Sequence, residues 1–145
     1  MRDILVPVSP GELLDKITIL RIKAARITDP AKLENVAVEL DLLTSIWRES
    51  GCAAQPDSET GRALAADEHA LEAVNAKLWD IEDRIREKEL AQRFDAEFIE
   101  LARAVYVSND ERAAIKKRIN VRLGSRIVEE KSYAGYRRSV YSAPQ

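Results

Sequence analysis

Residues 64–85 read LAADEHALEAVNAKLWDIEDRI, and this stretch decides the fold class. Its apolar side chains recur at steps of three, four and seven residues, which places them on one face of a helix. This seam consists of Leu64, Leu71, Val74, Leu78, Ile81 and Ile85, with Asp67 as its one polar member. The pattern extends on both sides, so we predict one long helix from about Glu59 to about Leu90.

Two helices are predicted before it, each with its own start signal. Residues 9–12 (SPGE) offer a capping serine, a proline at the first helical position and a glutamate that completes a capping box. Residues 29–30 (DP) repeat the signal for a second helix, which Gly51 ends. Because the connection is so short, the two helices must form an antiparallel hairpin, which we expect to pack on the long third helix.

Two shorter helices are predicted after it. Asp95 caps the first of them, and residues 108–111 (SNDE) form a capping box that starts the second. The sequence therefore predicts an all-α protein, with an antiparallel helical hairpin packed on a long heptad-patterned third helix plus two shorter C-terminal helices. We expect residues 1–133 to form a single helical domain and residues 134–145 to be a loosely ordered tail.

The composition of the 145-residue chain argues against several classes of protein. A hydrophobic fraction of 46% argues against disorder. The single cysteine, Cys52, allows no internal disulfide and no cysteine-rich zinc site, and the single histidine, His69, has no evident metal-ligand partner. We expect no metal and no cofactor. No stretch approaches the ~20 apolar residues of a membrane span, and no signal peptide is evident, so we expect a cytoplasmic protein that does not enter a membrane.

The net charge of −2 hides an asymmetry along the chain. Residues 1–111 carry 23 acidic and 14 basic side chains, whereas residues 112–145 carry two acidic and nine basic ones. Such a split is typical either of a basic arm for an anionic partner or of two parts that dock on each other. We favour docking, within one chain or between subunits.

A polar stripe flanks the apolar seam of the long helix. Its steps of four, three, one and three residues place these side chains along one side of the helix: Asn75, Trp79, Glu82, Asp83 and Arg86. A carboxylate pair beside an arginine, an amide and an aromatic wall suits a polar ligand or acid–base chemistry. An ion-pair network that ties this helix to a neighbour is the interpretation we favour.

A second stripe is basic and lies near the C-terminal end. It consists of Asn109, Arg112, Lys116 and Asn120, spaced three, four and four residues apart. Its charge suits a phosphate or a sugar nucleotide, but we expect it to pair with the acidic stripe of the long helix. Nucleic acid is a weaker interpretation, because the stripe is short and the sequence pI is near 5.6. A Mg²⁺ site formed by Glu39 and Asp41 with Glu82 and Asp83 is a weaker interpretation still, because the spacing of these carboxylates fits poorly with paired acidic motifs on two facing helices.

Four segments resemble a family of short bacterial proteins catalogued only as a domain of unknown function. They are residues 6–20 (VPVSPGELLDKITIL), 75–88 (NAKLWDIEDRIREK), 109–116 (NDERAAIK) and 128–133 (VEEKSY). The core of the second segment is also similar to a second uncharacterised helical family, often encoded among polysaccharide glycosyltransferase genes. The resemblance implies a helical fold and a surface-polysaccharide context, and it assigns no catalytic residue.

Two functions are therefore open at the level of the sequence. The first is a non-enzymatic homodimer or accessory protein that acts through its helix faces, with a partner in a glycosyltransferase pathway. The second is a small enzyme or ligand-binding domain for an anionic or sugar-nucleotide ligand, with its site between the two polar stripes. The observation that separates them is whether the stripes line an open pocket or bury each other.

Overall fold

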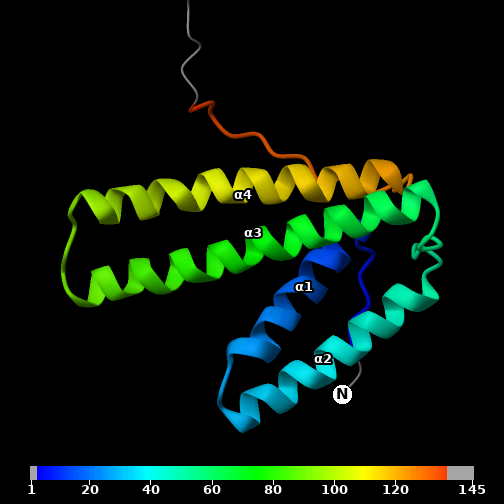
Figure 1. The fold of residues 1–145 in the computed structure, drawn as a ribbon, viewed down its shortest axis with the longest axis horizontal. Coiled ribbons are helices and arrows are strands. Elements are labelled where there is room, and N and C mark those ends of the chain that lie inside the picture. The colour runs from blue at the N-terminus through cyan, green and yellow to red at the C-terminus, as the bar shows by residue number, and fades with distance from the viewer. Residues whose placement is uncertain (1–2, 137–145) are drawn as a thin grey trace, which may run out of the picture.

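The computed structural model describes residues 3–136, and within them the chain forms four helices and no strand. The helices are α1 (Pro10–Arg26), α2 (Pro30–Glu49), α3 (Glu59–Leu90) and α4 (Ala96–Arg122). Figure 1 shows α3 and α4 as a long antiparallel hairpin, with the α1–α2 hairpin branching from one side of it. The predicted all-α fold class is confirmed, while residues 137–145 of the predicted tail lie outside the described residues.

The helix starts follow the local capping chemistry that the sequence predicts. Ser9 Oγ accepts a hydrogen bond from the backbone N–H of Glu12 at 3.2 Å, and Asp29 caps α2 in the same way. The carboxylate of Asp95 accepts from the N–H of Phe98 at 3.1 Å. Gly51, just past the end of α2, has a φ of +70°, a left-handed conformation that glycine adopts without strain. These boundaries are confirmed because each depends on a few neighbouring residues.

The predicted break between two C-terminal helices is wrong, because α4 is continuous from Ala96 to Arg122. Ser108, the expected cap, is a fully buried residue in the middle of this helix, and its Oγ has no hydrogen-bond partner among the described residues. No glycine or proline interrupts the helix here. The long apolar face of α3 instead runs against α4, so an unbroken α4 buries more of it than two separate helices would.

The core lies where α1, α3 and α4 meet. Its buried members come from all three helices: Leu14, Leu64, Leu71, Val74, Ile115 and Ile119. The predicted seam of α3 is largely confirmed, since Leu64, Leu71, Val74, Leu78 and Ile81 are buried. Its polar exception, Asp67, is buried as well, and its carboxylate accepts hydrogen bonds from Arg118 and Arg122 of α4. Part of the basic excess of the C-terminal region thus docks on acidic groups within the same chain.

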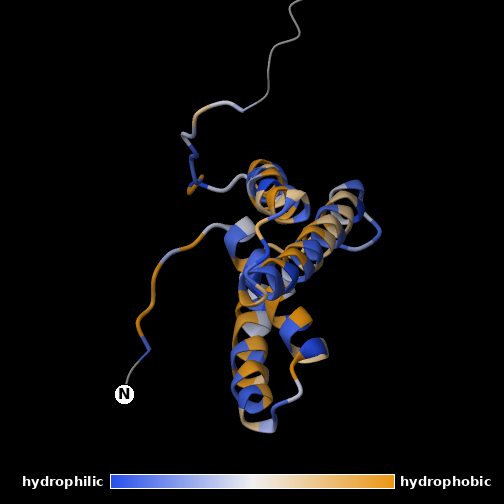
Figure 2. Cartoon of the chain, turned by 90° about the vertical axis from the view of Figure 1, so that its left-hand side faces the viewer, coloured by the Kyte–Doolittle hydropathy of each residue, from blue (hydrophilic) through white to orange (hydrophobic). Residues whose placement is uncertain are grey.

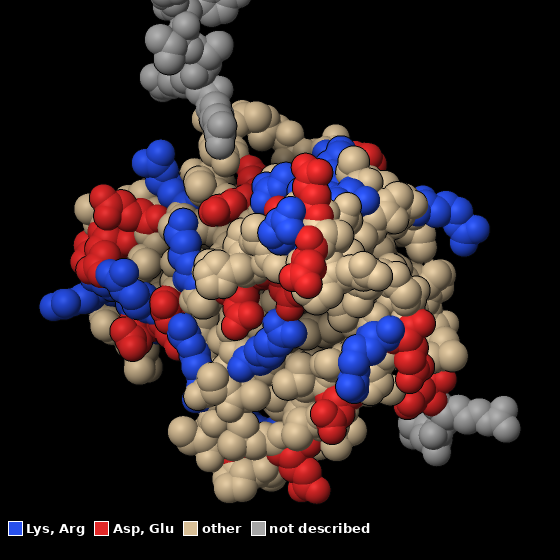
Figure 3. Space-filling model, turned by 45° about the vertical axis from the view of Figure 1, so that its right-hand side comes forward, with Lys and Arg blue, Asp and Glu red and all other residues tan. Residues whose placement is uncertain are grey.

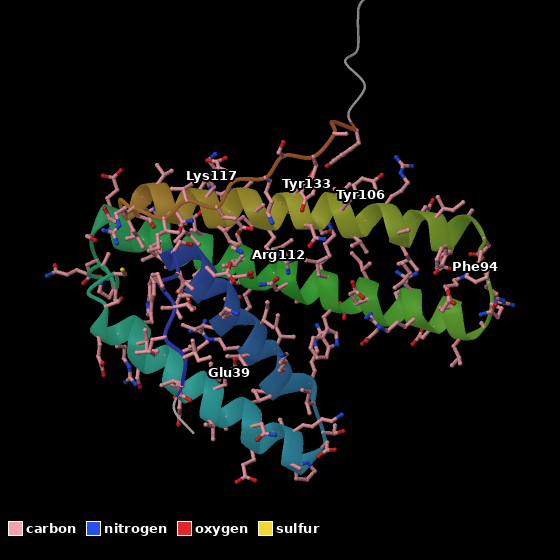
Figure 4. All side chains as sticks on the ribbon, turned by 180° about the vertical axis from the view of Figure 1, so that it is seen from behind. Glu39, Phe94, Tyr106, Arg112, Lys117 and Tyr133 are labelled. Carbon is pink, nitrogen blue, oxygen red and sulfur yellow. The ribbon has the colours of Figure 1, made fainter. Side chains whose placement is uncertain are left out.

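The second helix of the predicted hairpin has fewer neighbours than expected. The backbone of α2 packs on α1 alone among the described helices, and only Trp47 reaches the core. The predicted hairpin therefore packs on α3 through α1, while α2 makes no backbone contact with α3. Glu39 is an exposed residue of α2 (Figure 4), and α2 makes no backbone contact with α3. Glu39 therefore does not meet Glu82 in the Mg²⁺ site considered above.

Two apolar surfaces remain exposed in consequence. Val38, Leu42 and Ile46, four residues apart on α2, are 67%, 50% and 41% exposed. The segment 4–6 is also exposed, and Figure 2 shows this apolar stretch standing clear of the helices.

Candidate ligand-binding site

The N-terminal turn of α1 lies directly against α4, and Gly11 makes this approach possible. Its backbone N–H donates to Asn120 Oδ1 at 2.7 Å. A Cβ at this position would lie only 2.6 Å from the carbonyl oxygen of Lys116. Asn120, one of the nine predicted site residues, therefore fastens α1 to α4 and is buried.

A buried polar network extends from this contact between the three helices. The Lys116 ammonium lies 2.5 Å from a carboxylate oxygen of Glu12 and 3.4 Å from one of Asp15. Asp15, which is only 6% exposed, accepts a hydrogen bond of 2.7 Å from Asn75 Nδ2. The Asn75 amide also donates to Thr18 Oγ1 at 3.1 Å. The amide of Asn75 is thereby fixed in one orientation, with its oxygen directed toward α4.

Arg112 completes the network and differs from the other cations in it. Its Nη1 donates to Asn75 Oδ1 at 3.2 Å, and its Nη2 donates to Asn109 Oδ1 at 2.8 Å. Both acceptors are neutral amides, and no ion pair within residues 3–136 includes Arg112. This half-buried guanidinium is therefore held in place without a carboxylate to neutralise its charge.

Arg112 lines an open depression of about 510 Å³ between α1, α3 and α4. Seven of the nine predicted site residues line it: Asn75, Trp79, Glu82, Asp83, Arg86, Asn109 and Arg112. Residues Ile19, Lys23 and Leu78 complete the lining. The ring of Trp79 is approached by the guanidinium of Arg26 at 5.9 Å from its centroid, which restrains the indole. The volume lies within the range of small-molecule sites.

The two stripes meet where Arg112 donates to Asn75, but no carboxylate of the first stripe forms an ion pair with a cation of the second within residues 3–136. Glu82 forms an ion pair with Arg86 one turn along α3, and both side chains are substantially exposed. No ion pair of Asp83 or of Lys23 is found in the described part of the chain, although both side chains line the depression. The acidic stripe therefore faces open space beside Arg112, and the stripes do not bury each other.

Lys116 lies one turn beyond Arg112 on α4, does not line this depression and has a different environment. Burial by itself would lower the pKa of Lys116, but the carboxylates of Glu12, Asp15 and Glu129 outweigh this effect and raise the pKa above its ordinary value. Lys116 stays charged and is already neutralised by these partners. Its role is to join α1 to α4, while Arg112 retains an unbalanced charge.

The contribution of α1 to the site was not predicted from the sequence. Asp15 and Thr18 follow one another on a face that also holds Gly11 and Ile22, all of them buried. Buried polar side chains need partners, so a carboxylate at a buried helix position was the available signal. Lys23 follows the same side of α1 toward the depression.

Three other features of the described residues concern metal-binding groups, surface charge and helix hydrophobicity. No group of three or more histidine, cysteine or carboxylate side chains in residues 3–136 is placed to hold a metal ion. On the face shown in Figure 3, acidic and basic side chains are interspersed. None of the helices in this range combines the length and hydrophobicity needed to cross a membrane.

The fold and the depression define an all-helical protein with a candidate ligand site at the meeting point of three helices. The chain belongs to a family described as "Family of unknown function (DUF6165)", which it matches over residues 4–143. No curated protein and no solved structure matches it. The family relationship agrees with the resemblance to a domain of unknown function, and the site must be interpreted from its own geometry.

Proposed function

We propose that this protein is a ligand-binding domain for an anionic, hydroxyl-rich small molecule such as a sugar phosphate. The observation that carries the proposal is the state of Arg112, a half-buried guanidinium that two amide oxygens orient at the edge of an open depression. A guanidinium restrained in this way is pre-organised for phosphate or carboxylate, since little side-chain entropy is lost on binding. Lys23 adds a second unpaired cation to the same lining.

The remaining lining suits the uncharged part of such a ligand. Asp83 and the carboxylate of Glu82 accept hydrogen bonds from hydroxyl groups. Trp79 offers an aromatic face to an apolar or sugar ring. Because cations and carboxylates stand side by side, the site favours a molecule with an acidic group at one end and hydroxyls at the other. A purely polyanionic ligand would meet the charge of Asp83.

The test is binding of glucose 1-phosphate, measured by isothermal titration calorimetry and by thermal shift. We expect a ligand-dependent rise in the melting temperature, because a ligand of the folded state stabilises it. The variant Arg112→Gln should lose at least tenfold in affinity. Its matched control is Arg103→Gln, which removes the same charge from an exposed position of α4 outside the depression and should bind like the wild type.

A second pair of outcomes separates binding from folding. Arg112→Gln should keep a helical circular dichroism spectrum and a cooperative melt. If glucose 1-phosphate, citrate and inorganic phosphate all fail to bind the wild type, the proposal is wrong. Equal binding by Arg112→Gln and the wild type would also refute it.

A second candidate function, a homodimer, is favoured by the exposed apolar face of α2. The seam of α3 does not supply this surface, because α1 and α4 cover it. Each copy offers both the Val38–Leu42–Ile46 face and the apolar segment 4–6, so two copies related by a twofold axis could cover both at once. Light scattering should then give twice the chain mass of 16.3 kDa, and Leu42→Glu should give a monomer. A wild type that stays monomeric at 200 μM refutes this candidate.

The biological setting is part of the proposal. We place the domain in the cytoplasm, where phosphorylated sugars are made, and we propose that it serves a glycosyltransferase pathway of surface polysaccharide. Either a bound sugar phosphate or an accessory role in a dimer is compatible with this setting. The sugar-phosphate titration addresses the first role and light scattering the second.

A further inference from the structure

A second depression, of about 660 Å³, lies on the other side of Arg112. Its lining is aromatic and polar: Tyr106, Tyr133, Tyr136, Lys131, Asn109 and Arg112 are among its members. Tyr106 and Tyr136 contact each other edge to face, with their ring centroids 4.9 Å apart. Figure 4 shows Tyr106 and Tyr133 close together along α4. Three tyrosine rings on one rim are notable in a chain that has four tyrosines in all.

The segment that follows α4 forms the outer wall of this depression. Residues 125–136 turn back along α4 (Figure 1). Glu129 fastens this segment to α4, because its carboxylate lies 3.5 Å from the Lys116 ammonium; its pair with Lys131, at 2.8 Å, lies within the segment. The Tyr106–Tyr136 contact fastens it at the other end. Tyr136 is therefore held against Tyr106 of α4, and Tyr133 lies in the segment between these two points of attachment.

The two depressions adjoin, since Asn109 and Arg112 line both of them. The Arg112 guanidinium thus stands between the depression lined by tyrosines, the aromatic chamber, and the chamber lined by Trp79 and carboxylates. We infer that the ligand is bipartite, a nucleoside diphosphate carrying a sugar. Its flat base lies among the tyrosines, its phosphates meet Arg112, and its sugar occupies the chamber lined by Trp79 and Asp83. This inference rests on the proposed function and extends it to a second subsite.

The chemistry of each part matches its chamber. Aromatic side chains hold nucleobases by stacking, which tolerates either a purine or a pyrimidine. A guanidinium binds phosphoryl oxygens through two parallel hydrogen bonds. Tyr133 is 77% exposed and Tyr106 is 40% exposed, so both rings have uncovered surface for a base to bury. A simple sugar phosphate would leave this aromatic chamber unused.

The experiment compares UDP-glucose, ADP-glucose and glucose 1-phosphate by calorimetry on the full chain. Both sugar nucleotides should bind at least tenfold more tightly than glucose 1-phosphate. Tyr133→Ser should reduce that advantage to less than threefold and leave the affinity for glucose 1-phosphate unchanged. Tyr133→Phe keeps the ring and should keep the advantage. The matched control is Phe94→Ser, which removes an exposed aromatic ring at the distant α3–α4 turn (Figure 4) and should change none of the three affinities.

The outcomes separate this inference from the proposed function. If glucose 1-phosphate binds and the sugar nucleotides bind no more tightly, the aromatic subsite is wrong while the proposed function stands. If Tyr133→Ser keeps the full advantage, the base does not lie among the tyrosines and the inference is overturned. If none of the three compounds binds, this inference is overturned, and the proposed function fails with it when citrate and inorganic phosphate do not bind either. Because Tyr133 is exposed and lies beyond the helices, its replacement leaves the core intact, and a melt of each variant verifies this.

Discussion

The replacement Gly11→Ala tests the junction on which the whole site is built. A Cβ at Gly11 would lie 2.6 Å from the backbone oxygen of Lys116 and 2.9 Å from Asn120 Oδ1, whereas ordinary contacts begin near 3.4 Å. The amide side chain can rotate away, but the backbone oxygen belongs to a helix and cannot. The first turn of α1 must therefore move outward by roughly 0.8 Å, the difference between 3.4 and 2.6 Å.

The size of the effect follows from three contributions. Overpacking of a tight contact costs about 1–3 kcal/mol. The hydrogen bond from the Gly11 N–H to the buried Asn120 lengthens or breaks, which adds about 1–3 kcal/mol. The higher helix propensity of alanine offsets up to about 1 kcal/mol of this loss of stability. Taken at the middle of the first two ranges, with the full alanine contribution subtracted, these give a net loss of about 3 kcal/mol, which lowers the melting temperature by roughly 6–12 °C in a domain of this size.

The assay is urea and thermal unfolding followed by circular dichroism. Gly135→Ala is the matched control, because a Cβ there meets no atom within 4 Å. It should change the free energy of unfolding by less than about 0.5 kcal/mol. The double variant Gly11→Ala/Asn120→Ala should remain destabilised, since the clash with the Lys116 carbonyl persists. If Gly11→Ala is as stable as the wild type, α1 does not approach α4 as described.

Three further predictions concern the charged groups. Asp67→Asn should destabilise the fold by about 1–3 kcal/mol in urea unfolding, because the buried carboxylate loses its charge opposite Arg118 and Arg122 of α4. The effect is limited because both arginines are partly exposed, and a change below about 0.5 kcal/mol would contradict the prediction. Glu82→Gln should cost less than about 0.5 kcal/mol, since its ion pair is exposed and lies within one helix, and a loss above about 1 kcal/mol would restore the purely structural interpretation of the acidic stripe. The hydrogen bond from Lys131, with the charge of Lys116, holds the pKa of Glu129 below its ordinary 4.5. The contact between Glu129 and Lys116 of α4 should therefore persist at pH 4.5 and be lost as the pH falls through that lower value, which loosens residues 125–136. Amide hydrogen exchange of this segment measures the release, and exchange that is independent of pH after correction for the intrinsic rate would refute it.

The helices themselves were predictable because their signals are local. The seam of α3 repeats at helical spacing, and the caps Ser9, Asp29 and Asp95 each act on backbone groups two or three residues away. The failure at Ser108 has the same origin. Its motif is a valid capping signal by local rules, but the packing of α4 along α3 outweighs a cap of about 1 kcal/mol.

The sequence also determined which side chains share the polar side of α3, since helical periodicity fixes them relative to one another. Tertiary structure alone decided what stands opposite. Arg112 meets two amides rather than Glu82, and Lys116 meets Glu12 and Asp15 of α1. Spacing along one helix carries no information about the crossing of another. Here that crossing is set by the close approach at Gly11, which brings carboxylates of α1 to Lys116 and leaves the charge of Arg112 unbalanced beside an open depression.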